Sequence, residues 1–207
     1  MAYDDLTGMK LDAGRVVDAR SKEVTDIRDK RVYDKIPRHQ ALRSKWKIIR
    51  TRWIDINKGD DENPVYRSRL VGKEVNDGQM DGLFAATPPI ESKKMLFSMA
   101  VTEGVGYRKG DRKNGMKLDF IDVRRAYVHA PSRRTVYVQL PPEDAEPGKC
   151  GRLTKSMYGT RDAAQNWEMA YSDFMRENGF EVGSTSPCLF YHEKSCLLYT
   201  SPRPRDL

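Results

Sequence analysis

Residues 116–139 read MKLDFIDVRRAYVHAPSRRTVYVQ, the most informative stretch of the chain. Met116, Leu118, Phe120 and Asp122 would fall on one face of a strand, with Ile121 and Val123 on the other, and a second alternating run covers residues 135–139. Asp122 ends an apolar row, so its carboxylate is expected at the exit of a buried strand, where Mg²⁺ can take oxygen ligands. Two-metal phosphoryl transfer needs that geometry. A capping or turn role for Asp122 stays open, because strand ends are rich in Asp.

Several blocks around this stretch resemble one protein family. Residues 122–127, followed by residues 136–142, are similar to the first metal-binding motif of copia-type (long-terminal-repeat) retrotransposon reverse transcriptases. Further blocks resemble the family in the same order: residues 51–55, 66–73, 86–89, 151–159, 167, 179–180 and 186–190. Separated blocks in the right order are more specific than a single short motif, and together they cover residues 45–194.

The resemblance implies an α+β fold with reverse-transcriptase-like fingers and palm. Residues 1–44 would be a variable charged lead-in, 45–110 a fingers-like hairpin and helix, 111–194 a partial palm, and 195–207 a tail foreign to the family. The family continues into a turn with two adjacent Asp residues and then a thumb. The tail has no such pair, and its Asp206 follows two prolines that oppose strand pairing. The chain is therefore expected to be truncated before the second catalytic carboxylate motif and the thumb.

The same resemblance implies roles for individual residues. Asp122 would be the catalytic residue and a ligand of Mg²⁺, although a two-metal site would be incomplete here. Nucleotide contacts would come from Arg69 and Lys73 in the hairpin, from Arg125, and from Tyr127 as a steric gate against a ribose 2′-hydroxyl. Each of these four also has an ordinary interpretation: a solvated strand face for Arg69 and Lys73, a surface cation for Arg125, and half-buried packing for Tyr127.

One turn is expected near the template and nucleotide. It contains Tyr158, Gly159, Arg161 and Asp162. Asp162 stands where many relatives have Gln, and this departure weakens the nucleotide contacts expected from the turn. An Asp at this position also suits the N-cap of the following helix.

The periodicity of apolar residues and the positions of turn-forming residues predict the main helices and strands. Residues 48–54 and 65–71 read as two strands joined by a turn at 57–64, which together make a basic hairpin. Residues 91–103 carry apolar side chains at helical spacing and are expected to be core rather than site. The clearest helix is 162–178, with Gly179 at the C′ position, and it is expected to pack under the palm sheet. Its predicted apolar stripe consists of Ala164, Trp167, Ala170, Tyr171, Phe174 and Met175. A short exposed helix is expected at residues 22–31.

Composition is consistent with these expectations without adding much. The 207 residues carry 37 Lys plus Arg against 30 Asp plus Glu, a net charge of +7 that favours a polyanionic partner. Apolar content of 38% predicts a core that is modest or shared with further chain. The sequence has no signal peptide and no membrane span, and its three cysteines fit no disulfide framework, so reduced thiols in an intracellular protein are expected.

Three functions of different classes follow. The first is a partial RNA-directed DNA polymerase, inactive as this isolated chain, whose reaction is attack of a primer 3′-hydroxyl on a deoxynucleotide α-phosphate. Its partners would be a primer–template, deoxynucleoside triphosphates and the rest of a polyprotein with thumb and RNase H. The second is a non-catalytic nucleic-acid-binding remnant with salt-dependent affinity. The third is a structural or protein-interaction module, which would expose an apolar face.

Overall fold

The structure is a computed structural model that describes residues 1–44, 47–75, 85–87, 89–118, 122–184, 186–193 and 197–200. Its Cα atoms cluster into two compact units. Unit 1 combines residues 1–83 with 127–167, and unit 2 combines residues 84–126 with 168–205. Both helices and sheets occur, which agrees with the expected mixed α and β composition.

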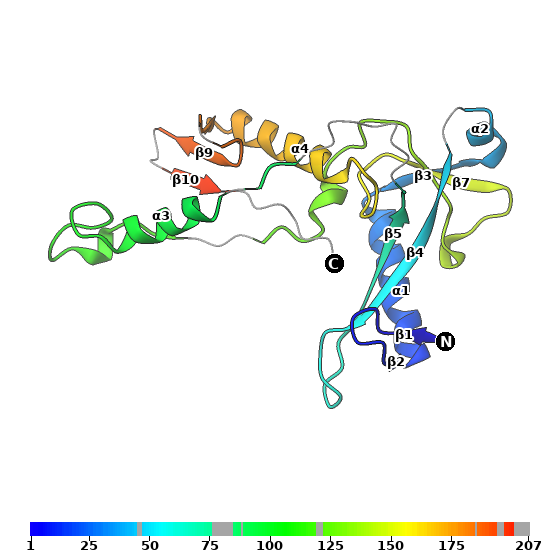
Figure 1. The fold of residues 1–207 in the computed structure, drawn as a ribbon. Coiled ribbons are helices and arrows are strands. Elements are labelled where there is room, and N and C mark those ends of the chain that lie inside the picture. Colours follow the sequence, from blue (N-terminus) through cyan, green and yellow to red (C-terminus); the bar gives the residue numbers. More distant parts are fainter. Residues whose placement is uncertain are drawn as a thin grey trace. The chain divides into compact units, whose positions relative to one another are not determined.

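A five-stranded sheet forms the centre of unit 1 (Figure 1). Its order is β3-β7-β6-β4-β5, with antiparallel neighbours except for the parallel pair β4 and β6. The strands have these bounds: β3 Tyr33–Pro37, β4 Ile48–Asn57, β5 Tyr66–Lys73, β6 Tyr137–Val138 and β7 Lys149–Leu153. The second alternating run of the sequence therefore does form a strand, in shortened form.

The predicted basic hairpin is confirmed. Strands β4 and β5 pair from Arg50 opposite Lys73 to Asn57 opposite Tyr66. In the turn, the Asn57 side-chain oxygen accepts hydrogen bonds from the backbone N–H groups of Gly59 at 3.1 Å and Val65 at 2.8 Å. An Asn that closes a turn with its own side chain is the chemistry that the sequence signalled.

The expectation of a short exposed helix in the lead-in was wrong in both length and exposure. The lead-in contains a small β1 (Ala2–Tyr3) and β2 (Lys10–Leu11) pair and the helix α1 (Ala13–Asp29), far longer than the short helix expected at residues 22–31. Helix α1 lies against β5, as Figure 1 shows. Its buried apolar residues recur at helical spacing: Val16, Ala19, Val24 and Ile27. The many charges between them hid this period.

Helix α1 contributes directly to the core of unit 1. One buried cluster joins α1, the loop after it, four strands and the turn after β7, and it consists of Ile27, Val32, Tyr33, Leu70, Val136, Val138, Leu140, Leu153 and Met157. The short helices of this unit are α2 (Arg38–Leu42), η2 (Ala126–His129) and η3 (Pro142–Asp144), and Ala126 of η2 is counted with unit 2. Removal of large apolar surface from water is the main favourable term here.

A buried carboxylate ties the same elements together by charge. Asp144 of η3 is 2% exposed and accepts hydrogen bonds from the Tyr33 hydroxyl at 2.6 Å and from Lys35 Nζ at 2.8 Å. Arg28 of α1 also pairs with it. Burial raises the pKa of Asp144, but hydrogen bonds from Lys35, Tyr33 and Arg28 outweigh burial and hold that pKa below its usual value.

Unit 2 contains helix α3 (Ile90–Val101), the short η1 (Arg112–Asn114), most of α4 (Ala163–Glu177) and a three-stranded antiparallel sheet. That sheet has the order β10-β9-β8, with β8 at Glu181–Val182, β9 at Leu189–His192 and β10 at Leu197–Thr200. The Tyr171 ring of α4 meets the Phe190 ring of β9 edge-on at 5.4 Å between centroids. This contact is a favourable aromatic geometry.

The predicted helix at 162–178 is confirmed as α4. Gly179 has φ of 84° and donates to the Arg176 carbonyl, while Phe180 N–H donates to the Met175 carbonyl. This pair of bonds is a Schellman motif, which requires a left-handed residue at the C′ position. Of the predicted apolar stripe, Met175 is buried whereas Phe174 is 58% exposed.

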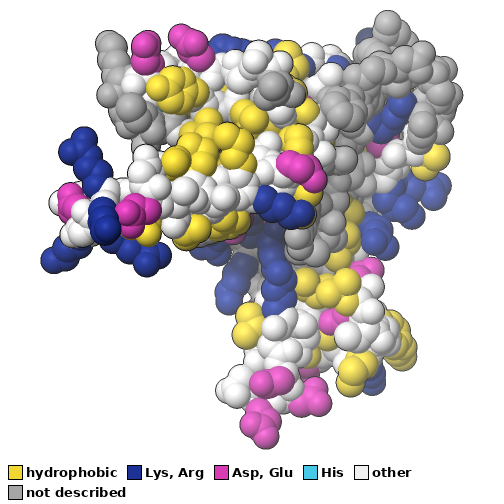
Figure 2. Space-filling view, turned by 60° about the vertical axis from the view of Figure 1, so that its left-hand side comes forward, with side chains coloured by type: hydrophobic (Ala, Val, Ile, Leu, Met, Phe, Trp, Pro, Cys, Tyr) yellow, Lys and Arg dark blue, Asp and Glu magenta, His cyan; other side chains and the backbone are white. Residues whose placement is uncertain are grey.

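Helix α3 does not form core, contrary to expectation. None of its residues is buried, and Met95 and Phe97 are 59% and 48% exposed. Hydrophobic side chains are also visible at the surface in Figure 2. Helical spacing of apolar residues thus predicted the helix but not its burial.

The strand expected at residues 116–122 is not seen where the structure describes it. Residues 116–118 and Asp122 are irregular, and residues 119–121 lie outside the described part. In the tail, Leu197–Thr200 forms β10, while residues 201–207 with Asp206 lie outside the described part as well.

Cys150 and Cys188 are buried free thiols, and Cys196 lies outside the described part. None of the helices described here has the length and apolar run that a bilayer crossing needs.

Candidate functional site

The end of β5 docks on the turn that follows β7. Gly72 N–H donates to the Tyr158 carbonyl at 2.7 Å, and Glu74 N–H donates to the Gly159 carbonyl at 3.3 Å. Gly159 has φ of 78°, and a Cβ placed there would overlap the carbonyl oxygen of Gly72. Only glycine combines this backbone conformation with so close an approach. The turn is therefore held against the strand by main-chain contacts.

Arg69 lies on β5 beside this turn. Its Cζ atom is 4.8 Å from the centroid of the Tyr158 ring, the geometry of a cation–π contact. Its Nε is buried and has no hydrogen-bond partner among the described residues. A buried guanidinium N–H that lacks a partner is costly, and phosphate oxygens match the planar fork of arginine. The arrangement can accept an anionic group.

Tyr127 and Tyr158 share a second apolar cluster. Their ring centroids are 4.5 Å apart, and Tyr127 is 1% exposed. Val71 of β5 and Ala163 of α4 complete the buried part of the cluster, and Ile54, Ala164 and Trp167 pack against it. Tyr127 is therefore packed more deeply than the half-buried position expected from its ordinary interpretation. Its role as a steric gate stays a prediction.

A cluster of charged side chains also contacts this turn. One Arg134 nitrogen, Nη2, lies 2.5 Å from Glu74 Oε2 and 2.9 Å from Asp162 Oδ1. Glu74 also accepts from the backbone N–H of Arg161 at 2.8 Å, and Asn166 donates to Asp162 at 2.9 Å. Burial lowers the pKa of Arg134, but hydrogen bonds with Glu74 and Asp162 outweigh it, so the pKa is raised and the guanidinium stays charged.

The structure thus brings together Arg69, Tyr127, Tyr158, Gly159, Arg161 and Asp162 within unit 1. Lys73 ends β5 beside them and is exposed. Asp122 and Arg125 belong to unit 2. Asp122 is exposed in a loop, and Arg125 follows it with φ of 56°.

The described residues do not supply a metal centre. No group of three or more His, Cys, Asp or Glu side chains is placed to hold an ion anywhere in the described ranges. Asp122 is one exposed carboxylate, and tight Mg²⁺ binding uses carboxylates together with substrate phosphates. The donor set present does not fit a pair of Mg²⁺ ions.

Sequence reasoning missed Glu74 and Arg134. Arg134 follows another arginine in a loop before β6, and Glu74 directly follows β5. Neither lies in a periodic run, so no pattern pointed to them. Only the fold brings the two side chains to the same turn.

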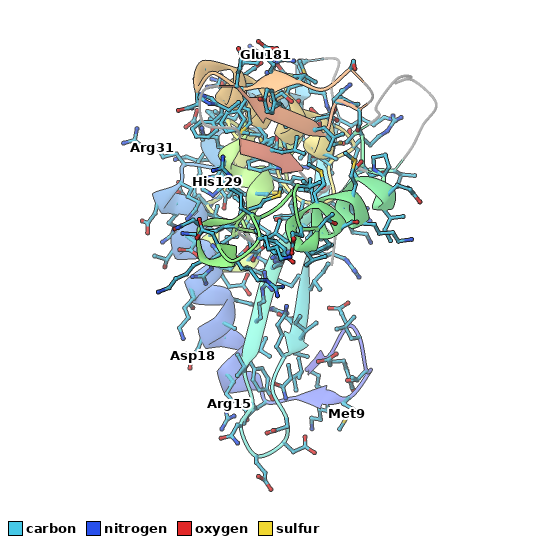
Figure 3. All side chains as sticks on the ribbon, turned by 90° about the vertical axis from the view of Figure 1, so that its left-hand side faces the viewer. Met9, Arg15, Asp18, Arg31, His129 and Glu181 are labelled. Atoms are coloured by element: carbon cyan, nitrogen blue, oxygen red, sulfur yellow. The ribbon has the colours of Figure 1, made fainter. Side chains whose placement is uncertain are left out.

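A groove elsewhere in unit 1 lies between α1 and the hairpin turn. Its lining includes Arg15, Asp18, Lys22 and Glu62, and Figure 3 shows Arg15 and Asp18 near this end of the hairpin. Two charges of each sign give the groove no preference for an anion. It does not compete with the Arg69 region as a phosphate site.

Comparison with known proteins identifies the family of the chain. The model of the reverse transcriptase (RNA-dependent DNA polymerase) family matches residues 39–197. No solved structure gives a significant match to the chain.

Curated relatives are polyproteins of transposons. The chain is 24% identical over 152 residues to the retrovirus-related Pol polyprotein from transposon TNT 1-94 of Nicotiana tabacum, which covers 69% of this chain and 10% of that protein. It is 26% identical over 153 residues to the corresponding polyprotein from transposon RE1 of Arabidopsis thaliana, with the same two coverages. A Ty1-BL Gag-Pol polyprotein of Saccharomyces cerevisiae is 30% identical over 78 residues, 37% of this chain and 4% of that protein. The chain thus spans about 10% of the length of the first two.

Proposed function

Because this chain belongs to the reverse transcriptase (RNA-dependent DNA polymerase) family, we propose that it is part of the RNA-directed DNA polymerase of a copia-type retrotransposon polyprotein. In this proposal residues 45–110 act as the fingers and bind a deoxynucleoside triphosphate and the primer–template. Residues 111–194 form part of the palm with Asp122. The reaction of the complete polymerase is attack of the primer 3′-hydroxyl on the α-phosphate, with pyrophosphate leaving. The isolated chain binds but does not catalyse.

One observation carries the binding half of this proposal. Arg69 presents a buried guanidinium N–H without a partner in the described part, on a surface built by Tyr158 and the Gly72–Gly159 contact. The Arg69 side chain as a whole is only half-buried, and its guanidinium would bind a triphosphate with charge-assisted hydrogen bonds. Lys73, further along the same strand, would add a second cation.

The proposal that the isolated chain does not catalyse rests on the carboxylates available to bind metal ions. Two-metal transfer bridges attacking and leaving oxygens with two ions, which need carboxylates from more than one segment. The described residues offer Asp122 alone at the expected position. We propose that the missing carboxylates, the thumb and RNase H belong to the remainder of the polyprotein.

Primer extension tests the catalytic half. With Mg²⁺, a primed poly(rA) template and dTTP, the purified chain is expected to incorporate no nucleotide above background. A version extended by the family's Asp-Asp strands and thumb is expected to extend the primer, and Asp122→Ala in that version to abolish extension. Mg²⁺-dependent extension by the chain alone, lost in its Asp122→Ala variant, would show that the proposal of inactivity is wrong.

Nucleotide titration tests the binding half. Arg69→Met is expected to weaken dTTP binding at least about tenfold, since hydrogen bonds to charged groups contribute about 1.5–3 kcal/mol each. Arg67 is half-buried on the same strand, like Arg69, and is the matched control. Arg67→Met removes the same charge but no hydrogen bond to the nucleotide, so it is expected to change the affinity less than about twofold. Isothermal titration calorimetry measures both. Equal losses in the two variants would mean that only general electrostatic attraction acts.

The second candidate function is a non-catalytic nucleic-acid-binding remnant. The net charge of +7 and the basic hairpin favour it, and Figure 2 shows Lys and Arg side chains spread over the visible surface. It predicts RNA binding that weakens steeply with salt while dTTP is not bound. The dTTP titration therefore separates the two candidates.

A further inference from the structure

We infer that Arg134 is a positioning residue, which holds the turn at residues 158–162 on the end of β5 and thereby sets the geometry of Arg69 and Tyr158. The inference deepens the proposed function, because its consequence for nucleotide binding rests on that function. Its consequence for the turn itself does not.

Arg134 joins three separate segments. Glu74 follows β5, Arg134 precedes β6, and Asp162 directly precedes α4. One guanidinium nitrogen reaches both carboxylates, at 2.5 Å and 2.9 Å. The three side chains are 13%, 16% and 7% exposed, so water screens the cluster little.

The two carboxylates connect in turn to the backbone of the site. Glu74 accepts from Arg161 N–H and donates its own N–H to the Gly159 carbonyl. Asp162 accepts from Arg134 on one oxygen and from Asn166 on the other. Asn166 also donates to Ser156 at 3.0 Å, before the turn. Arg134 therefore holds both ends of the turn that carries Tyr158. The contacts of Arg134 with Glu74 and Asp162 are called the brace below.

Charge explains why the brace depends on Arg134. Two carboxylates bonded to the same nitrogen lie close to one another, and without the cation they would repel each other in poorly screened surroundings. Movement of the turn away from β5 would reduce this repulsion. That separation would break the bonds from Gly72 and Glu74 to the turn and move Tyr158 away from Arg69.

The charge of Asp162 is essential to this arrangement. A neutral Gln could accept a hydrogen bond from Arg134 but could not balance its charge. Both Asp162 oxygens already have protein donors, so this carboxylate serves the brace and leaves nucleotide contact to Arg69.

Hydrogen exchange at single amides tests the positioning role in the full chain. In Arg134→Met, the Gly72 and Glu74 amides are expected to exchange at least about tenfold faster at a temperature where circular dichroism shows full folding. Arg133→Met, at the exposed neighbouring arginine, is expected to leave both amides unchanged. Unchanged exchange in Arg134→Met would overturn the inference. Acceleration spread evenly over unit 1 would also overturn it, because that result marks a merely structural role.

A rescue variant sharpens the test. Removal of both carboxylates in the same chain, Arg134→Met with Glu74→Gln and Asp162→Asn, is expected to restore much of the protection at Gly72 and Glu74, since the repulsion is gone. If Arg134→Met does not fold, Arg134→Lys keeps the charge without the fork and is expected to accelerate exchange at the same two amides. The inference would be overturned if the triple variant did not restore protection and Arg134→Lys did not accelerate exchange.

Nucleotide affinity supplies the separate functional readout. Where the wild-type chain binds dTTP, Arg134→Met is expected to weaken binding about tenfold through displacement of Tyr158 and Arg69, and the triple variant to recover part of it. An unchanged affinity in Arg134→Met would overturn the link to the nucleotide. Absence of dTTP binding by the wild type would overturn the proposed function, while the exchange result still decides the positioning role.

Discussion

Replacement of Gly159 by alanine is expected to lower the free energy of unfolding of the chain by about 3 kcal/mol. Two costs add in this variant. The left-handed backbone, with φ of 78°, disfavours any residue with a Cβ, and that Cβ would overlap the Gly72 carbonyl. The turn must therefore move off β5, which also breaks the hydrogen bond from Gly72 to Tyr158. Urea unfolding followed by circular dichroism measures the loss.

Gly148→Ala is the matched control for this prediction. Gly148 has φ of 72°, but a Cβ there meets nothing within 4 Å among the described residues. Only the backbone cost remains, so this variant is expected to lose about 1 kcal/mol. Equal losses at Gly148 and Gly159 would mean that the close approach to Gly72 contributes nothing.

Asp144→Asn is expected to destabilise the chain by about 2–3 kcal/mol. The substitution keeps the shape of the side chain but removes the charge that faces Arg28 and Lys35. Because Asp144 is 2% exposed, water cannot replace the lost interaction, and Lys35 is left partly buried beside a neutral group. The same urea unfolding experiment at pH 7 measures the difference from wild type.

Asp34→Asn is the control at the surface. Asp34 pairs with Arg152 at 3.1 Å, but both side chains are about half exposed, at 51% and 52%. Exposed pairs contribute little, so this variant is expected to lose less than about 0.5 kcal/mol. A loss as large as that of Asp144→Asn would show that burial does not set the strength of these pairs.

The pH dependence of wild type supplies a second check on Asp144. Because the folded state holds the pKa of Asp144 below its usual value, its contribution is present above the unfolded pKa of about 3.9 and is lost as the pH falls through the folded pKa. The difference in stability between wild type and Asp144→Asn is therefore expected to shrink below about pH 4. A difference that stays constant from pH 7 to pH 3 would contradict the ion-pair account.

Local patterns predicted the elements whose signals are local. The hairpin followed from two alternating runs around an Asn-rich and Gly-containing turn, and α4 followed from its apolar stripe and Gly179. In both cases the residues that define the element also supply its hydrogen bonds or caps. The family followed from several short blocks in a fixed order, and the match over residues 39–197 confirms it.

Burial was less predictable than secondary structure. Helix α1 has the helical period but many charges, so its place in the core was missed, while α3 has apolar residues that stay exposed. Whether an apolar face is covered depends on what the rest of the chain places against it, which a single helix does not encode.

The family, the hairpin, the α4 helix and the residue types at the candidate site could be predicted from the sequence, because they depend on short-range periodicity and on the order of short motifs. Three contacts appear only in the folded chain: Arg69 stacks on Tyr158, Gly159 approaches Gly72 too closely for a Cβ, and Arg134 pairs with both Glu74 and Asp162. These contacts join residues 28 to 89 positions apart, and no local pattern specifies which distant side chains meet. Packing of β5 against the turn after β7 makes those pairs neighbours, and exclusion of water there gives their charges strength.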